Sequence, residues 1–380
     1  MTTTDLSKNN ELNMKRLLEN GMGINAEIKT YDNHWQGKWC VYNRLGIIAP
    51  RMPSWAITGI ALSQYDTRGG QAKVLLRKIA RLVYLNSMGL LADKSLDISA
   101  KHISSKNIFF WWRGRLMRLY DMDEQSITYT VKEGITNKFL EKILYFRQKY
   151  KHDFLIELID SGDDWYKEPI IQGKTLAMYQ NKTEYNALLK RSIISMKQIA
   201  QETVVFKDPH DYVGELTRKI NANIAALPAN IANYDVLKKI VNNLRIKSQQ
   251  LDKPVPVVLA HCDLHPQNIL IDQNNKIYLI DWEAYDFRSI WYDPAVLLLE
   301  FRRSAGINNM LLNYNHQNII DAVLVNDEQK SYNMESVMSI LIMENILGKT
   351  IIAKELKQGA GTVLHNFVEY FSHISWYQNL

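Results

Sequence analysis

The chain has 380 residues, of which 46% are hydrophobic and 23% charged, and this composition is typical of a globular protein long enough for two or three compact units. Its two cysteines exclude a disulfide framework, and its apolar runs are shorter than the roughly 18 to 20 residues that cross a bilayer, so we expect a cytoplasmic protein with no transmembrane segment. The net charge of +6 suits an anionic ligand, but aromatic residues do not interleave with the basic ones, and we therefore expect no nucleic-acid partner.

Residues 1–105 are interpreted as an N-terminal extension that is polar at first. Its clearest element is the stretch "GGQAKVLLRKIARLVYLNSMGLL", whose periodicity predicts an amphipathic helix after Gly69 and Gly70. Helical spacing in "LLRKIARL" predicts that the basic residues lie on the solvated side of this helix. A peripheral role at a membrane stays open.

Residues 106–173 differ in composition from the segment before them. The runs "NIFFWW", "RLMRLYD" and "SITYTVKEG" are rich in aromatic and β-branched residues, and they predict an antiparallel meander of three strands. A helix capped by Thr136 or Asn137 should follow, because apolar residues recur at helical spacing from Phe139. "FLIELID" and "WYKEPIIQG" predict two further strands.

Residues 174–380 are predicted to be mainly helical, beginning with three helices in "KTEYNALLKRSIISMKQIAQE", "PHDYVGELTRKINANIAAL" and "NYDVLKKIVNNLRIKSQQL". Two short apolar strands, "NILID" and "KIYLID", interrupt this helical region. The turn "QNNK" joins them into a hairpin, which should bring Asn268 near Asp281.

The stretch "VLAHCDLHPQNILIDQNNKIYLIDWEAYD" has the spacing of a phosphoryl-transfer loop. In the pattern H-x-D-L-x-x-x-N, an aspartate accepts the proton of an attacking hydroxyl and an asparagine five residues later binds magnesium. Here these residues are Asp263 and Asn268, following His261. Asp281 supplies a second oxygen ligand, and one or two protein oxygens are enough for Mg²⁺ when phosphate and water complete its shell.

These residues resemble the catalytic core of the aminoglycoside phosphotransferase and choline kinase family, which are kinases of small molecules related to protein kinases. The family loop commonly reads H-G-D-L-H-P-x-N, and Cys262 stands here where glycine is usual. The resemblance covers residues 106–302 and implies an α+β, protein-kinase-like two-lobe fold. Its N-lobe, 106–173, would hold an antiparallel sheet plus a helix, and its C-lobe, 174–380, would be mainly helical and carry the catalytic loop.

The resemblance also implies an ATP-binding site and Mg²⁺ as cofactor. Lys132 matches the lysine that pairs with the nucleotide phosphates, and Glu141 matches its carboxylate partner, with Glu133 as the competing candidate. The main chain of Pro169, Ile170 and Ile171 would contact adenine. The turn Trp112–Arg115 lies where the phosphates would be covered, but it lacks the G-x-G-x-x-G of protein kinases, and we favour a plain hairpin turn. Asp293 matches an aspartate that steadies the catalytic loop.

Three alternatives compete with a small-molecule kinase. His261, Cys262 and His265 are zinc-ligand types, but Pro266 and the neighbouring strands disfavour the helix on which ligands four residues apart converge. A nucleotide-binding pseudokinase scaffold would usually have lost the base or a metal ligand. A protein kinase would carry D-F-G and A-P-E landmarks, which the sequence lacks.

The sequence therefore predicts an ATP-dependent phosphotransferase that acts on a hydroxyl of a small molecule. The acceptor pocket would be built by helices after residue 303, with Glu335, Glu344 and Tyr332 among its candidates. We rank a sugar or saccharide precursor first, choline or ethanolamine second and an aminoglycoside third. Protein partners are not indicated.

Overall fold

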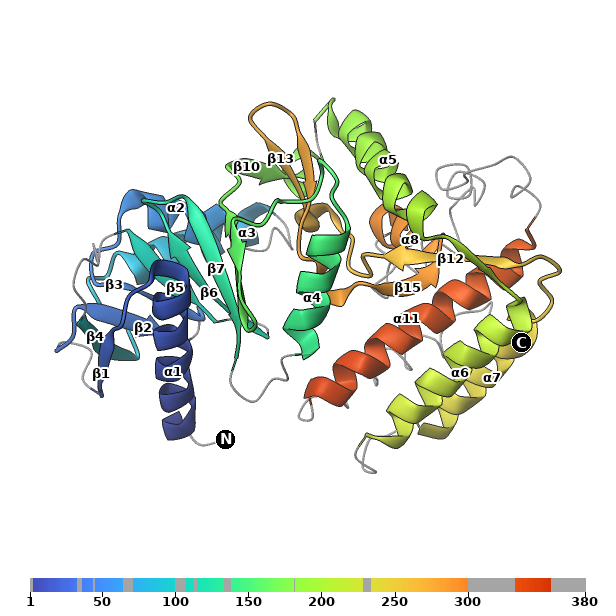
Figure 1. The fold of residues 1–380 in the computed structure, drawn as a ribbon, viewed down its shortest axis with the longest axis horizontal. Coiled ribbons are helices and arrows are strands. Elements are labelled where there is room, and N and C mark those ends of the chain that lie inside the picture. The colour runs from blue at the N-terminus through green and yellow to red at the C-terminus, as the bar shows by residue number, and fades with distance from the viewer. Residues whose placement is uncertain are drawn as a thin grey trace. The chain divides into compact units, whose positions relative to one another are not determined.

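The computed structural model describes residues 3–32, 36–43, 45–63, 71–99, 107–112, 115–132, 138–180, 182–227, 234–299 and 332–356 (Figure 1). The chain forms two compact units. The first comprises Met1–Met178 and Leu270–Glu283, and the second comprises Tyr179–Ile269 and Ala284–Leu380. The mixed α+β class is as predicted: the first unit is built on an antiparallel sheet, and the second is mainly helical.

The first unit contains a nine-stranded sheet in which every neighbouring pair is antiparallel. In spatial order its strands are β1 (Glu27–Tyr31), β4 (Lys94–Ser99), β2 (Trp39–Tyr42), β3 (Ile47–Pro50), β5 (Ile108–Trp111), β6 (Leu116–Asp121), β7 (Ser126–Val131), β9 (Trp165–Pro169) and β8 (Asp160–Ser161). The meander predicted from "NIFFWW" to "SITYTVKEG" is β5 to β7. The segment expected as an extension, 1–105, supplies β1 to β4, and β3 pairs directly with β5. The division expected at residue 105 therefore runs through one continuous sheet.

Helices cover both faces of this sheet, because its central strands carry apolar residues at successive positions. In β5, Phe109 packs in one buried cluster and Phe110 in the other, as the two-residue period of a strand requires. Helix α1 (Thr3–Met22) covers the second face with Met14, Leu17 and Leu18 and crosses in front of the sheet in Figure 1. This helix was not predicted, although the spacing of those three residues is helical.

The first face is covered by α4 (Lys138–Lys149), the helix predicted after the meander. Its buried residues Leu140, Ile143 and Leu144 join the same cluster as Phe109. Helices α2 (Trp55–Ser63) and α3 (Gln71–Leu85) each add one buried residue to this cluster, Ile57 and Leu85 respectively.

The strand predicted from "FLIELID" is wrong for most of its length, since only Asp160–Ser161 pairs in the sheet. Phe154, Leu155 and Ile156 are buried nonetheless. Their backbone finds other partners: the Leu279 amide donates to Phe154 O at 2.9 Å, and the Arg147 guanidinium donates to Ile156 O. This apolar run is thus a buried connection, and its backbone carbonyl groups accept hydrogen bonds from residues outside the nine-stranded sheet.

A second, small sheet in the first unit has the order β10 (Gly173–Thr175), β13 (Ile269–Asp272) and β14 (Ile277–Leu279). The predicted hairpin is present, with Asp272 Oδ1 accepting the amides of Asn274 and Lys276, each at 2.8 Å. Asn268 directly precedes its first strand, and Asp281 follows its second. A Cβ on Gly173 would lie 2.4 Å from Ile271 O, so glycine is required where β10 meets β13.

The second unit contains the three predicted helices as α5 (Tyr185–Thr203), α6 (Pro209–Ala225) and α7 (Tyr234–Ser248). Helix α6 begins with proline at its first position, and the Asp208 carboxylate accepts the amide of His210 at 2.8 Å as an N-cap. A three-stranded antiparallel sheet has the order β11 (Val205–Lys207), β12 (Val255–Ala260) and β15 (Asp286–Ser289). Helices α8 (Tyr292–Leu299) and α11 (Met334–Leu356) complete the described part of this unit.

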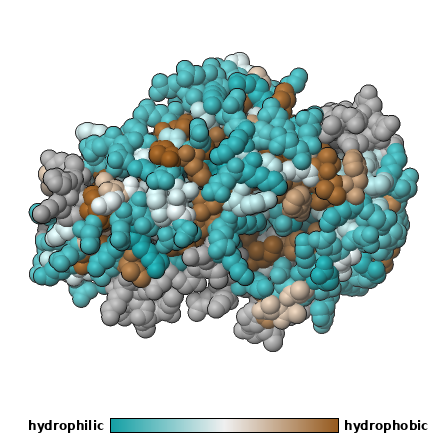
Figure 2. Space-filling view, viewed as in Figure 1, coloured by the Kyte–Doolittle hydropathy of each residue, from teal (hydrophilic) through white to brown (hydrophobic). Residues whose placement is uncertain are grey.

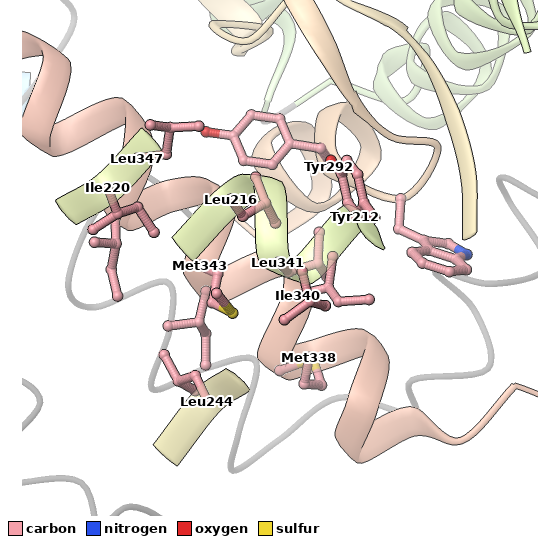
Figure 3. Close-up of a cluster of buried hydrophobic side chains, with 14 of the residues drawn as sticks. Tyr212, Leu216, Ile220, Leu244, Tyr292, Met338, Ile340, Leu341, Met343 and Leu347 are labelled. Carbon is pink, nitrogen blue, oxygen red and sulfur yellow. The ribbon is translucent and has the colours of Figure 1, made fainter. Parts of the chain in front are cut away.

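The core of the second unit lies between α6, α7, α8 and α11 (Figure 3). Leu216 and Ile220 of α6 point toward Met343 and Leu347 of α11, and Tyr292 of α8 reaches into the same cluster. Helix α11 has the length and hydropathy of a membrane span, but 78% of that window is buried inside the protein. Its apolar character is therefore explained by its position in the core. On the face seen in Figure 2 most of the surface is hydrophilic, with smaller hydrophobic areas between.

Candidate active site

The predicted catalytic loop leaves the end of β12, and Asp293 at the start of α8 holds its first turn. The carboxylate accepts the His261 amide at 2.5 Å and the Cys262 amide at 2.9 Å. His261 is fully buried, and its Nδ1 accepts the Asp263 amide at 3.3 Å. Burial raises the pKa of Asp293 to about 7, although the two backbone amides act in the opposite direction. Charged hydrogen bonds of this kind fix the backbone that carries Asp263.

Asp263 and Asn268 are brought together by the loop. The Asn268 Nδ2 donates to Asp263 O at 3.0 Å, and the Asn268 backbone amide donates to His265 O at 2.8 Å. Asp263 Oδ1 lies 3.5 Å from His265 Nε2, while the other ring nitrogen of His265 accepts the Gln267 amide at 3.2 Å. His265 thus shapes the loop and caps its short 3₁₀ turn, Pro266–Asn268.

Cys262 has a backbone φ of +64°, in the left-handed region where glycine is favoured. This conformation gives a physical reason for the glycine usual at this position in the resembling family. The Cys262 Sγ lies 3.8 Å from Asp286 O, and burial raises the pKa of the thiol to about 12.

In the first unit, Lys132 follows directly after β7. It is half-buried, and its Nζ donates to Trp112 O. Burial lowers the pKa of Lys132 to about 8; the charge of Arg118 lowers it further, and that of Glu283 raises it. The lysine is therefore still predominantly charged near neutral pH, within reach of both an arginine and a carboxylate.

Arg118 on β6 gathers the charged residues of this site. Its Nη2 lies 3.1 Å from Glu283 Oε1 and 3.8 Å from Asp281 Oδ1, and its guanidinium lies over the Tyr129 ring at 5.4 Å from the centroid. Asp281 has a φ of +67°, and its side chain is 40% exposed. Burial raises the pKa of Glu283 to about 7, and the neighbouring charge of Asp281 raises it too, while Arg118 lowers it. Two carboxylates and two cations therefore share one corner of the first unit.

Trp282 anchors the chain between Asp281 and Glu283. It is buried, its ring stacks on Phe146 of α4 with centroids 4.5 Å apart, and its Nε1 donates to Leu279 O at 2.8 Å. Because the indole is held on both sides, the two flanking carboxylates have a defined position.

The remaining predicted site residues are placed as follows. Glu141 is exposed on the first turn of α4, and the carboxylate whose charge acts on Lys132 is Glu283. Pro169, Ile170 and Ile171 are half-buried at the end of β9, where the Ile170 amide donates to Gln125 O at 2.7 Å. That amide is engaged, so an adenine contact would fall on other groups of this segment. Glu133 and the Arg113–Gly114 turn lie outside the described residues.

Two residues of this corner were missed or set aside by sequence reasoning. Sequence reasoning does not single out Glu283, because it follows a strand, where exposed carboxylates are common, yet its side chain is only 23% exposed. Arg118 is not singled out either. A signal was present in "RLMRLYD": a cation in the middle of an otherwise buried strand requires anionic partners.

Two of the acceptor candidates are carboxylates, and both have structural partners. Glu344 is fully buried in α11, where it accepts hydrogen bonds from the Tyr212 hydroxyl and from Ser289 Oγ, the latter at 2.7 Å. Glu335 pairs with Lys247. Glu344 is therefore a core residue that holds β15 to α11 and does not meet a substrate.

Each of the two predicted magnesium ligands offers an oxygen of the kind that a hard cation prefers. Asn268 commits its Nδ2 to Asp263 O, which leaves its carbonyl oxygen as the ligand atom, and Asp281 offers partly exposed carboxylate oxygens. Amide and carboxylate oxygens are ligands that Mg²⁺ prefers. Over the described residues, no group of three or more His, Cys, Asp or Glu side chains is arranged to hold a metal ion.

Comparison with known proteins bears on the same segment. Residues 173–322 match the model of the phosphotransferase enzyme family (APH). The resemblance predicted from the loop is confirmed. The matched range includes Asp263, Asn268 and Asp281, and it supports a transferase of phosphoryl groups. No curated protein matches the chain.

Solved structures similar to the chain include small-molecule kinases. The choline kinase LicA from Streptococcus pneumoniae has 14% identity and a TM-score of 0.48, with 68% of this chain and 90% of that chain covered. The Plasmodium vivax ethanolamine kinase has 14% identity and a TM-score of 0.46, with 83% and 94% covered. The streptomycin–ATP–APH(2″)-IIa ternary complex has 13% identity and a TM-score of 0.45, with 70% and 93% covered. At such low identities and TM-scores these likenesses decide nothing about the substrate.

Proposed function

We propose that the protein is an ATP-dependent kinase that transfers a phosphoryl group to a hydroxyl group of a small molecule. The observation that carries this proposal is the loop in which Asn268 Nδ2 holds Asp263 O at 3.0 Å while Asp293 holds the preceding amides. Catalysis of phosphoryl transfer depends chiefly on positioning and charge stabilisation, and a loop held at both ends supplies positioning.

In the proposed reaction Asp263 is the general base. Its carboxylate accepts the proton of the substrate hydroxyl as the oxygen forms a bond to the γ-phosphorus of ATP, and the bond from that phosphorus to the β-γ bridging oxygen breaks to release ADP. Lys132 binds the nucleotide phosphates, because its ammonium group with a pKa of about 8 is largely charged at neutral pH. The main chain of Pro169 to Ile171 is the proposed adenine contact.

Asn268 and Asp281 are the proposed ligands of Mg²⁺. When bound, the ion neutralises charge on the phosphate oxygens. Asp281 lies beside Arg118, so that a cation already balances this carboxylate. Asp263 and Asn268 belong to one unit, and Lys132 and Asp281 belong to the other.

The acceptor that we rank first is a sugar or saccharide precursor. A cationic amine such as choline, ethanolamine or an aminoglycoside would be attracted by carboxylates near the acceptor. In the described part of α11, however, Glu344 is buried in hydrogen bonds and Glu335 is paired with Lys247. This helix therefore favours a neutral, hydroxylated acceptor over a cationic one.

The test is ADP formation by the purified chain with Mg²⁺ and ATP, screened against sugars, amino alcohols and aminoglycosides, with the phosphorylated product identified by mass spectrometry. Asp263→Asn should abolish transfer but retain ATP binding, whereas Asp235→Asn, at an exposed carboxylate of α7, should behave as wild type. Near-full transfer by Asp263→Asn contradicts the assigned base. Binding of Mg²⁺ and ATP without transfer to any acceptor class would instead identify a pseudokinase scaffold.

A further inference from the structure

Exposed apolar side chains are concentrated on one part of the first unit. Among the described residues, ten of the twenty large apolar side chains that are exposed lie between residues 52 and 91. They are Met52, Trp55, Leu75, Leu76, Ile79, Leu82, Val83, Met88, Leu90 and Leu91. We call this set the α2–α3 face. Scattered exposed apolar residues are ordinary on a protein surface, but a concentrated group marks an interaction site.

Helix α3 is amphipathic, and its apolar side faces outward. Leu75, Leu76, Ile79, Leu82 and Val83 span an arc of about 120° at about 100° per residue, and their exposed fractions run from 36% to 66%. By contrast, Lys78 and Arg81 are half-buried. The sequence predicted that the basic residues face solvent, and the structure reverses this orientation. In helix α5, by comparison, Lys190 and Arg191 are exposed.

The outward orientation is set by how the segment is attached. Ile57 of α2 and Leu85 of α3 are buried in the core of the sheet. Arg51 donates to Gly37 O at 2.6 Å and to Met88 O at 3.0 Å, which ties both ends of the segment to each other. With these points fixed, the arc from Leu75 to Val83 is left outside the core.

The segment has a strong excess of basic over acidic residues. Residues 51–92 contain six basic residues, Arg51, Arg68, Lys73, Arg77, Lys78 and Arg81, against the single acidic residue Asp66. Four of the six belong to α3, which has no acidic residue. Trp55, an indole that is 80% exposed, lies at the start of α2. An apolar arc on a helix whose charged residues are all lysine or arginine, preceded by an exposed tryptophan, has the chemistry of a helix that lies in a lipid interface.

We propose that the α2–α3 face binds the surface of a membrane that contains anionic phospholipids. The apolar arc of α3 enters the boundary between headgroups and acyl chains, and Lys78, half-buried beside the arc, extends its ammonium group to the phosphate headgroups. A second copy of this chain fits the face less well, since two such segments would bring like charges together. The inference is independent of the proposed kinase reaction, because no residue of this face belongs to the candidate active site.

The test is co-sedimentation of the purified full chain with vesicles of phosphatidylcholine alone or of equal parts phosphatidylcholine and phosphatidylglycerol. We expect binding to the mixed vesicles that weakens with salt, and much weaker binding to the neutral ones. The double variant Leu76→Ser/Val83→Ser should bind at least about tenfold more weakly, because it removes apolar groups from the arc. Lys78→Gln should weaken binding about fivefold, which corresponds to about 1 kcal/mol per charge near an anionic surface, and Lys78→Arg should restore it.

The matched control is Val205→Ser/Phe206→Ser on β11 in the second unit. Val205 is 53% exposed and Val83 54%, while Phe206 is 59% exposed and Leu76 66%. If the control variant loses binding as much as the α3 variant does, the face is not responsible. Equal binding to neutral vesicles, or no binding to either, would overturn the proposal. So would a concentration-dependent dimer in ultracentrifugation that Leu76→Ser/Val83→Ser dissociates, since the face would then be a contact between copies.

Discussion

Replacing Asp293 by asparagine should flatten the pH dependence of stability. The folded protein holds this carboxyl at a pKa of about 7, against an ordinary value of 3.8, because burial penalises the charged form. The pKa difference is about 3, and at about 1.36 kcal/mol per pKa unit the ionised carboxylate costs about 4 kcal/mol of folding free energy. Such a cost is large beside a total stability of roughly 5 to 15 kcal/mol.

The sign follows from proton binding. Below pH 3.8 the carboxyl is protonated in both states and contributes no pH dependence. Between that value and about 7 the unfolded chain is ionised while the folded protein keeps its proton, so unfolding releases a proton and the free energy of unfolding falls as pH rises. Above about 7 both states are ionised, and the dependence levels off.

The assay is urea unfolding of wild type and Asp293→Asn between pH 5 and 8. Asparagine does not ionise, so the wild-type free energy of unfolding should fall relative to that of the variant by about 2 kcal/mol between pH 5 and 7. The raised pKa of Glu283 acts in both proteins, and its effect cancels in the difference. Parallel pH curves with equal m-values would refute the reasoning, since Asp293 would then ionise as freely when folded as when unfolded.

The same variant should separate stability from catalysis. An asparagine side chain offers one acceptor oxygen, and its amide hydrogens face an N–H donor of His261 or Cys262. The loop that carries Asp263 then loses one of its two anchors. We expect kcat to fall about 100-fold with little change in ATP affinity, as is found when reacting groups are displaced by about 1 Å.

Three further substitutions test the first unit and the loop. Lys132→Met should weaken ATP binding at least about tenfold without loss of folding, because a half-buried lysine is replaced by an apolar side chain of similar length; calorimetry with ATP checks this. Glu283→Gln removes a charge that raises the pKa of Lys132, so the affinity for ATP should start to decline at a lower pH. Glu141→Gln, at an exposed position of α4, should leave the pH profile of ATP affinity unchanged. An equal shift of the profile in both variants contradicts the assignment of Glu283. Cys262→Gly should stabilise the protein by about 1 kcal/mol, because glycine adopts the φ of +64° without strain; a lower urea midpoint would show that the side chain's packing outweighs the strain.

The loop and the helices were predictable because their signals are short-range. The spacing from His261 to Asn268 lies within eight residues, and the helices 185–203, 209–225 and 234–248 follow from apolar periodicity and caps such as Asp208. The hairpin of β13 and β14 was marked by its polar turn. Each of these is determined by neighbours in the chain.

The features that were not predictable depend on residues far apart in sequence. The pairing of Ile47 with Trp111 joins the first hundred residues to the meander, and no local pattern marks it. Arg118 donates a hydrogen bond to Glu283, which lies 165 positions later in the chain, so the sequence around either residue does not predict the pair. The orientation of α3 likewise depends on which of its residues, here Leu85, finds the core.

The buried carboxyl groups of the second unit hold the catalytic loop in place at a cost in folding stability. Asp293 binds the amides that begin the loop, and Glu344 binds Ser289 on β15, the strand that pairs with β12 immediately before the loop. Burial raises the pKa of both groups, so neither is a favourable place for a charge. Apolar side chains of the same volume would stabilise such a core equally well or better, but they cannot accept a backbone amide. The burial of these two carboxyl groups is unfavourable for stability, but it fixes the position of the loop that carries Asp263. Exact positioning of the reacting groups is what phosphoryl transfer depends on most.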